Sequence, residues 1–254
     1  MTDRPITIIA ECGINHNGDM HRAVDMIWEA EQCGADVAKF QIYRPERILD
    51  LKKPRIIDHW DIIKATELSF ENVCLLKSVC DKAQIEFFAS VFHPDRVEWT
   101  EKIGVERYKI ASRSIYNKDL AEAIAATNKP VIMSWGWYEP QKGYPVLINH
   151  LAAWGRTKHL YCIAEYPTSL KDLQFIDREG SIFEGDGHDG FSDHTVVITA
   201  SVMAMSLGAT IIEKHFTLSR SLPGCDQVCS MEPDELRRLC EMRNDVEEIL
   251  YGDN

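Results

Sequence analysis

Short apolar runs with the composition of β-strands alternate with amphipathic helical segments through the whole sequence. Each run is bounded by polar or glycine-containing segments, a pattern that favours the buried strands of a parallel sheet. We predict strands at Pro5–Ala10, Asp36–Gln41, Ile85–Ala89, Arg107–Ala111, Pro130–Met133, His159–Ile163, a short run leading into Ser192, and Ala209–Glu213. Regular alternation of strands and helices indicates an α/β fold in which helices cover a parallel sheet.

Helical periodicity predicts the segments between these strands. The first helix should begin after an N-cap at Asp19 and end near Gly34. The last should begin at Pro233 and bury an apolar stripe made of Leu236, Leu239, Val246, Ile249 and Leu250. The other predicted helices lie near 70–82, 94–103, 118–126, 144–154, 170–176 and 196–207. The long charged segment 43–68 is expected to form an ordered lid or rim loop.

Eight strand–helix units in 254 residues match the count and size of a TIM barrel, the closed (β/α)8 fold. We therefore expect one catalytic barrel domain spanning residues 1–254. The competing architecture is an open, doubly wound sheet. It is disfavoured because no G-x-G-x-x-G or P-loop motif follows the first strand and because polar residues follow nearly every strand.

Composition narrows the class of protein. The formal net charge of −12 argues against nucleic-acid binding, which needs a basic face. No apolar run approaches the roughly 18–20 residues that cross a bilayer, and the N-terminus has no signal-peptide pattern, so we expect a cytoplasmic protein without a membrane partner. The eight cysteines form no C-x-x-C pair, and reduced thiols are expected.

Two histidines follow neighbouring strands near the end of the chain. His194 lies in Gly190-Phe-Ser-Asp-His-Thr195, and His215 follows the apolar run Ala209-Thr-Ile-Ile212. Carboxyl ends of neighbouring parallel strands meet at one edge of a sheet, which is where active sites of α/β proteins lie. The two imidazoles could hold a divalent metal and leave positions open for substrate and water. The alternative is that each histidine only satisfies local backbone groups.

Polar side chains at the other strand ends should share this mouth of the barrel. They are Glu11, Lys39, Gln41, Ser90, Lys109, Ser112, Ser134, Ser192, Lys214 and Asp226. Lysines and serine hydroxyls converging on one mouth indicate a phosphorylated or carboxylated ligand. Lys39 and Lys109 lie within apolar runs, and buried lysines are rare unless paired. Because a buried lysine can also form a Schiff base, the residues alone leave an aldolase open.

Four motifs in order resemble the sialic acid (N-acetylneuraminate) synthase family, which includes the legionaminate and pseudaminate synthases. They are Ile9-Ala-Glu-Cys-Gly-Ile-Asn-His-Asn-Gly18, Gly34-Ala-Asp-Val-Ala-Lys-Phe-Gln41, Phe191-Ser-Asp-His-Thr195, and Ile212-Glu-Lys-His-Phe-Thr217 with Pro223-Gly-Cys-Asp226. The resemblance runs from about Ile6 to Leu250 and covers the catalytic barrel of that family.

The resemblance implies a transferase that condenses phosphoenolpyruvate with an N-acylated hexosamine, giving a 2-keto-3-deoxy sugar acid and phosphate. It implies a divalent metal, commonly manganese with magnesium or cobalt as alternatives, on His194 and His215. The implied phosphoenolpyruvate site comprises Lys39, Ser90, Lys109, Ser112, Ser134 and Ser192. Gln41, Tyr166 and Asp226 resemble sugar contacts, and Glu11 resembles a residue near the reacting carbons. Glu11 and Asp226 are the candidates for proton transfer.

The sequence departs from the family pattern in its sugar-binding half. A glutamate expected two residues after Ser112 is Ser114, an asparagine expected two residues before Tyr166 is Ala164, and the expected Thr-Gly after Ser134 is Trp135-Gly136-Trp137. From the resemblance we also expect a protein without the family's C-terminal antifreeze-like domain and its sugar-binding arginine. We therefore expect an altered acceptor, and either a homodimer or a separate capping subunit.

Two rival functions stay open at this point. One is a Schiff-base aldolase or a metal-dependent sugar isomerase on the same fold. The other is a non-catalytic or partner-dependent sugar-binding barrel.

Overall fold

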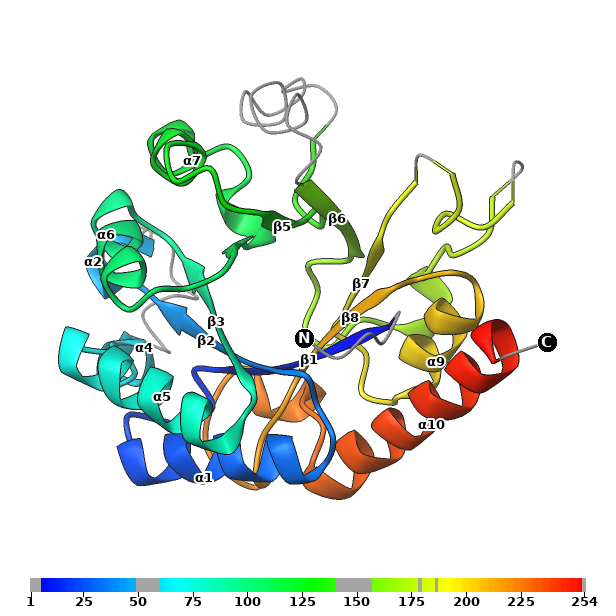
Figure 1. Ribbon diagram of the computed structural model, residues 1–254, viewed down its shortest axis with the longest axis horizontal. Helices are drawn as coiled ribbons and strands as arrows, with labels where there is room; N and C mark the ends of the chain where they lie inside the picture. The colour runs from blue at the N-terminus through cyan, green and yellow to red at the C-terminus, as the bar shows by residue number, and fades with distance from the viewer. Residues whose placement is uncertain (1–5, 49–59, 140–156, 178–179, 186, 253–254) are drawn as a thin grey trace.

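The computed structural model describes residues 6–48, 60–139, 157–177, 180–185 and 187–252. Eight parallel strands follow chain order round a closed barrel, in which β1 pairs with both β2 and β8 (Figure 1). They are β1 (Thr7–Gly13), β2 (Val37–Ile42), β3 (Glu86–Val91), β4 (Tyr108–Ile110), β5 (Val131–Ser134), β6 (Thr157–Cys162), β7 (Gly190–Asp193) and β8 (Ile211–His215). The predicted TIM barrel is confirmed.

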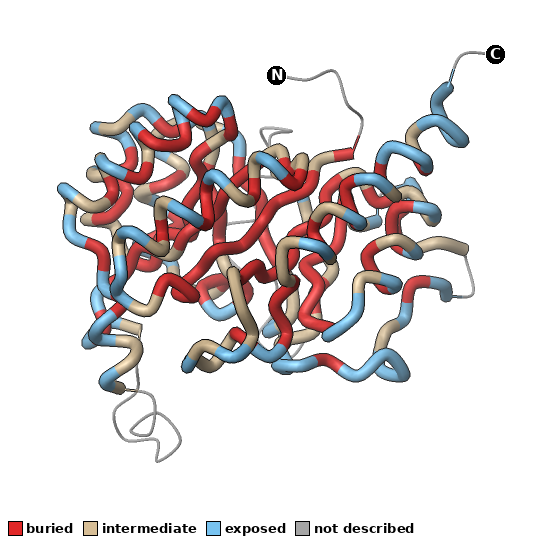
Figure 2. The backbone as a smooth tube through the Cα atoms, turned by 90° about the horizontal axis from the view of Figure 1, so that it is seen from below, coloured by how far each residue is buried: buried red, intermediate tan, exposed pale blue. Residues whose placement is uncertain are grey.

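Helices surround the barrel, with buried residues in the strands and on the inward faces of the helices (Figure 2). They are α1 (Met20–Gln32), α2 (Pro45–Ile48), α4 (Trp60–Ala65), α5 (Phe70–Ala83), α6 (Pro94–Lys102), α7 (Lys118–Ala125), α9 (Thr199–Ser206) and α10 (Pro233–Tyr251). The described residues also form the 3-10 turns η1 (Ser112–Ser114), η4 (Leu170–Asp172) and η5 (Gln227–Cys229). The helix predicted at 144–154 and residues 49–59 of the predicted lid lie outside the described residues.

Local chemistry sets where the first helix begins and ends. The Asp19 side chain accepts hydrogen bonds from the backbone N–H groups of His21 and Arg22, as an N-cap does. Gly34 has φ +90°, the left-handed conformation that ends helices and that glycine adopts without a Cβ penalty. Both predicted ends of α1 are therefore confirmed.

The apolar stripe predicted for the last helix is wrong at its C-terminal end. Leu236, Leu239 and Val246 are buried, but Ile249 is 80% and Leu250 is 46% exposed. The last turns of α10 project beyond the rest of the described chain, which leaves these side chains largely in contact with solvent (Figure 2).

The helix predicted at 170–176 is also wrong, because the chain makes only the 3-10 turn η4 and then continues in extended conformation at Leu173. This path lets Phe175 pack against Phe191 and Tyr161, with ring centroids 5.0 Å and 5.9 Å apart. Aromatic rings thus replace a helix over the outer face of β6 and β7 in the described part of this connection. The helix predicted at 196–207 starts three residues later, at Thr199.

Several strands extend further than predicted, which matters for the site. β1 reaches Gly13, β3 reaches Val91 and β8 reaches His215. The sequence pattern placed the strand ends where polarity increases. In the observed strands the alternation of side chains continues through these extensions. Every second side chain therefore points into the barrel, where the polar ones form hydrogen bonds and ion pairs with one another.

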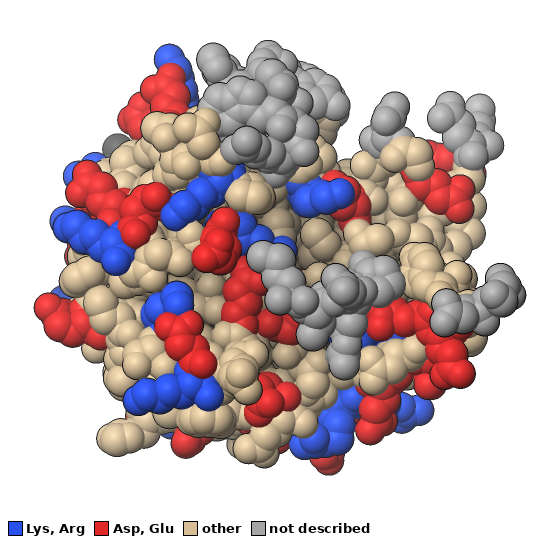
Figure 3. Space-filling view, in the orientation of Figure 1, with Lys and Arg blue, Asp and Glu red and all other residues tan. Residues whose placement is uncertain are grey.

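Three further observations concern the described chain and its surface. None of its helices is both long enough and apolar enough to cross a membrane. The eight cysteines form no disulfide bond in the described chain, in line with the reduced thiols predicted. On the face shown in Figure 3, acidic and basic side chains are interspersed among the coloured residues.

Candidate active site

The lumen of the barrel is built in layers by the period-two alternation of its strands. One layer is apolar and consists of Ile9, Val37, Phe88, Ile132, Leu160 and Ile211. Two residues further along these strands, and from β4 and β7, the lumen becomes polar. We call this second layer the polar ring: Glu11, Lys39, Ser90, Lys109, Ser134, Cys162, Ser192 and Glu213, all buried. It contains two ammonium groups, two carboxylates, three hydroxyls and one thiol at the carboxyl-end side of the apolar layer.

Lys39 is the most fully paired member of the polar ring. Its Nζ lies 3.0 Å from Oε2 of Glu11 and 3.0 Å from Oε2 of Glu213, and it donates to Oγ of Ser90 at 3.1 Å. Burial alone would lower the pKa of Lys39, but the two carboxylates outweigh burial and raise it. Lys39 is therefore held as a cation at neutral pH.

Lys109 has weaker support. It donates to Oγ of Ser134 at 2.7 Å and lies 3.4 Å from Oε1 of Glu213. Burial lowers the pKa of Lys109, and Glu213 offsets this only partly because the charge of Lys39 opposes it. The two buried lysines predicted at the mouth are thus brought together, with opposite shifts in pKa.

Glu213 links both lysines, although the residues predicted from the sequence to share the mouth did not include it. It also accepts a hydrogen bond from Oγ of Ser192 at 3.0 Å. Burial would raise the pKa of this carboxyl, but Lys109 and Lys39 lower it to about 2. The signal that could have found it is the alternation Ile211, Glu213, His215 along one face of β8.

The prediction that Lys214 shares the mouth is wrong, because alternation along β8 turns its side chain to the face opposite Glu213 and His215. Lys214 points away from the lumen, is completely buried between β8 and the surrounding layer, and pairs with Asp193 at 3.1 Å.

Glu11 and Gln41 meet at the next level of the lumen. Nε2 of Gln41 donates to Oε1 of Glu11 at 2.9 Å, so Glu11 is fixed by an amide on one side and by Lys39 on the other. Gly13 makes this contact possible, since a Cβ there would lie 3.2 Å from Oε1 of Glu11 and 3.3 Å from Nε2 of Gln41. Its φ of +49° also favours glycine.

His194 and His215 lie side by side at the mouth, with ring centroids 5.7 Å apart. Nδ1 of His194 is 2.7 Å from the carbonyl oxygen of Ile163. A carbonyl can only accept, so Nδ1 carries the proton and Nε2 keeps its lone pair, as in imidazoles that ligate metals. Burial and the neighbouring His215 lower the pKa of His194 to about 3. Nδ1 of His215 is buried and has no hydrogen-bond partner among the described residues.

This pair of imidazoles fits a divalent cation that takes two protein ligands and completes its shell with substrate and water. Among the described residues, no group of three or more His, Cys, Asp or Glu side chains is arranged to hold a metal. A metal at this mouth would therefore depend on non-protein ligands.

The remaining predicted residues form the rim rather than the ring. Tyr166 covers His194, with ring centroids 4.0 Å apart, and leaves 46% of its own surface exposed. Ser112 lies past the end of β4 in η1, and its Oγ accepts from the N–H of Trp137 at 2.7 Å. Asp226 is half-buried in the loop after β8 and belongs to no ion pair of the described chain. Ser112 thus holds a loop, while the Asp226 carboxylate accepts a hydrogen bond from the Cys225 thiol.

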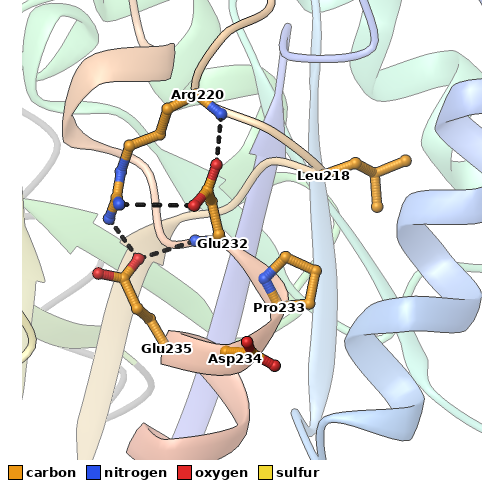
Figure 4. Close-up of a pocket in the computed structure, with 6 residues that line it drawn as sticks. All are labelled: Leu218, Arg220, Glu232, Pro233, Asp234 and Glu235. Atoms are coloured by element: carbon orange, nitrogen blue, oxygen red, sulfur yellow. Dashed lines mark hydrogen bonds and ion pairs between the residues drawn. The ribbon is translucent and has the colours of Figure 1, made fainter.

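The loop that carries Asp226 is closed by an ion-pair network outside the mouth (Figure 4). Arg220 bonds Glu232 through its backbone N–H at 2.8 Å, and its guanidinium pairs with Glu235. These side chains line a groove together with Leu218, Pro233 and Asp234. The charged groups are thus paired with one another, and their hydrogen bonds and ion pairs anchor the loop to the start of α10.

Comparison with known proteins identifies the family. A model of the NeuB family matches residues 26–254. The chain belongs to the NeuB family. It is 31% identical to the N,N'-diacetyllegionaminic acid synthase of Legionella pneumophila over 258 residues, covering 96% of this chain and 72% of that one. It is 31% identical to the pseudaminic acid synthase of Helicobacter pylori, covering 94% and 73%.

Solved structures of NeuB relatives share the barrel. The N-acetylneuraminic acid synthetase of Leptospira borgpetersenii superposes with a TM-score of 0.88 at 33% identity, over 99% of this chain and 87% of that one. A truncated 3-deoxy-D-arabino-heptulosonate 7-phosphate synthase of Thermotoga maritima has a TM-score of 0.68 at 16% identity, which is a likeness of fold alone. The resemblance drawn from four sequence motifs is confirmed, as is an enzyme of the sialic acid synthase type.

Proposed function

We propose that this NeuB-family chain condenses phosphoenolpyruvate with the open-chain aldehyde of an N-acylhexosamine-like aldose. The products are a 2-keto-3-deoxy sugar acid of the sialic acid type and inorganic phosphate. The observation that carries the proposal is the polar ring: two ammonium groups and three hydroxyls, with two carboxylates between them, on the strands that also carry the two imidazoles. Relatives named as legionaminic and pseudaminic acid synthases support it.

The ring supplies what a small, doubly anionic ligand needs. Lys39 and Lys109 are point charges for its carboxylate and phosphate, and the serine hydroxyls are neutral donors. Since Glu11 and Glu213 already neutralise both lysines, the ligand would bring excess negative charge into a buried site. A bound proton or a divalent cation must offset that charge.

His194 and His215 would hold the divalent cation, with manganese as the proposed ion. When bound, it supplies Lewis acidity toward the acceptor aldehyde. Tyr166 packs on the His194 ring and shields that side of the site from water.

The chain's own groups move the protons. Carbon 3 of phosphoenolpyruvate forms a bond to the aldehyde carbon while water adds at carbon 2. The resulting tetrahedral intermediate breaks the bond between carbon 2 and the phosphate oxygen, and the departing phosphate takes the proton of the carbon-2 hydroxyl as the ketone forms. Glu11, buried against Lys39, would accept the proton from water. Asp226, half-buried on the rim, would relay a proton from solvent to the aldehyde oxygen. Lys39 and Lys109 stabilise the negative charge that develops on the departing phosphate.

The acceptor side of the mouth carries small and aromatic residues. Ser114 is buried in η1, Ala164 precedes Tyr166 by two residues, and Trp137 is 52% exposed at the rim. An exposed indole can stack on the apolar face of a sugar or pack against an N-acyl group. We therefore propose an acceptor that presents an apolar face or acyl group toward Trp137.

The test uses purified protein with manganese, phosphoenolpyruvate and a panel of N-acylated aldoses, including N-acetylmannosamine and 2,4-diacetamido hexoses. Phosphate release that requires both substrates, with a 2-keto acid product, is the expected result. The matched control is the Lys39→Met variant, which should lose phosphate release. If no aldose supports release and neither substrate raises the melting temperature, the proposal is wrong.

A Schiff-base aldolase is the second candidate, because burial lowers the pKa of Lys109 toward a nucleophilic neutral amine. Borohydride reduction in the presence of pyruvate separates the two functions. An aldolase gives a trapped adduct of pyruvate on Lys109 by mass spectrometry. The condensation proposed above gives none and loses activity to chelator.

The homodimer and the cytoplasmic location stay predictions, and sedimentation of the purified chain tests the first.

A further inference from the structure

A completely buried ion pair lies just outside the lumen and takes no part in the chemistry proposed above. Oδ2 of Asp193 is 3.1 Å from Nζ of Lys214, and both side chains have no exposed surface. Asp193 and Lys214 are direct partners in the register of β7 and β8. Asp193 immediately precedes His194, and Lys214 immediately precedes His215. The ion pair thus fixes the two strands at the positions from which the two imidazoles project.

The pair also holds the backbone on the other side of His194. Oδ1 of Asp193 accepts from the N–H of Thr195 at 2.7 Å, and Nζ of Lys214 donates to the carbonyl of Thr195. Oδ2 of Asp193 accepts from Oγ of Ser201 in α9 at 2.6 Å. The residues before and after His194 are therefore both bound to the same buried charges.

We propose that Asp193 and Lys214 are positioning residues, which set the separation of the two imidazoles and the orientation of the His194 ring. A buried ion pair is a poor source of stability, because replacing it with uncharged groups of similar size is often neutral. A buried ion pair does fix the relative position of its two strands, because separating the charges would leave each of them buried and unpaired. Insofar as the imidazoles hold a metal, this inference rests on the proposed function.

The decisive variant removes both charges together, Asp193→Asn with Lys214→Met, so that no unpaired charge is left buried. Its melting temperature should stay within a few degrees of that of the unaltered protein. Its affinity for Mn²⁺, measured without substrates by the electron paramagnetic resonance signal of the free ion, should fall about 10- to 100-fold, as when groups that orient metal ligands are removed.

A matched control pair lies at the opposite end of the barrel. Nη1 of Arg243 in α10 is 2.7 Å from Oδ2 of Asp36, and the arginine is also completely buried. The variant Asp36→Asn with Arg243→Met removes a buried ion pair remote from the histidines. It should leave the affinity for Mn²⁺ unchanged whatever it does to the melting temperature.

A second readout needs neither metal nor turnover. Long-range ¹H–¹⁵N spectra of the imidazoles should show His194 as one tautomer, protonated at Nδ1, because that atom donates to Ile163. The double variant should show mixed tautomers. Ser201→Ala, which removes one bond to Asp193 and leaves both charges in place, should shift the same signals less.

These measurements distinguish failure of the proposed function from failure of the positioning role of Asp193 and Lys214. If the unaltered protein binds no Mn²⁺ and releases no phosphate, the proposed function fails, while the His194 tautomer still tests positioning. The positioning role is wrong if the double variant, or Ser201→Ala where the double variant does not fold, keeps the tautomer signature of the unaltered protein.

Discussion

Nζ of Lys39 lies 3.0 Å from Oε2 of Glu213, although their strands, β2 and β8, do not pair with each other. β1 lies between them in the barrel wall, and its Glu11 contacts the same ammonium group. The lumen therefore joins charges that are 174 positions apart in the sequence, from 39 to 213. Through these contacts the two lysines of the polar ring are paired with two carboxylates.

Removing the Glu213 carboxylate should disable the ring. In Glu213→Gln, two buried lysines share one remaining carboxylate, and breaking a buried pair costs about 3–5 kcal/mol of unfolding free energy. Phosphate release should fall at least about 100-fold, since the lysines would no longer be held in place. Chemical denaturation and steady-state kinetics measure the two effects.

The matched control for that variant is Glu86→Gln. Glu86 pairs with Arg107 at 2.7 Å near the start of β3 and is partly exposed. Its loss should cost about 1 kcal/mol or less and leave kinetics intact. Equal effects of the two substitutions on phosphate release would contradict the role given to Glu213.

Acid should weaken the fold partly through the same carboxyl. The pKa of Glu213 is lowered from 4.5 to about 2, so its stabilising effect is complete above the unfolded value and is lost as pH falls from about 4.5 toward 2. The difference in unfolding free energy between the unaltered protein and Glu213→Gln should therefore narrow by about 1–3 kcal/mol between pH 7 and pH 3. Urea titrations at both pH values check this, and a constant difference would argue against a lowered pKa.

Binding of phosphoenolpyruvate without metal should take up protons. The ring already pairs two cations with two carboxylates, so an added carboxylate and phosphate raise the proton affinity of a ring carboxylate. Calorimetry in buffers of different ionisation enthalpy should show an uptake of about 0.5–1 proton per ligand at pH 7. Glu11→Gln should reduce it, whereas an enthalpy independent of the buffer in the unaltered protein would count against this charge balance.

Chelator should abolish phosphate release, and manganese should restore it. His194→Gln and His215→Gln should each lower turnover by at least about 100-fold at saturating phosphoenolpyruvate. His159→Gln is the control, because His159 lies on the outer side of β6, where its Nδ1 accepts from Nε1 of Trp135 at 2.8 Å. Full activity in the presence of chelator would rule out the metal role.

Most of the polar residues that line the lumen could be predicted from the sequence, because a polar residue inside an apolar strand is unusual and indicates a function. Lys39 and Lys109 stand out in their runs, and both are buried in the ring as predicted. Glu213 and Lys214 show the limit of that signal. A run of three polar residues, Glu213-Lys214-His215, gave no indication that the middle one faces the other way until β8 was known to extend to His215.

The sequence by itself determined the number and order of the strands, the helix starts at Asp19 and Pro233, and the family. These depend on local spacing, capping chemistry and motifs, which can be read from residues close together in the chain. The tertiary structure decided which charges meet. Register across the closed barrel paired Lys39 with Glu213, gave Asp193 and Lys214 to each other outside the lumen, and set the two imidazoles side by side. Distances of a few ångströms between residues far apart in sequence arise only when the sheet closes.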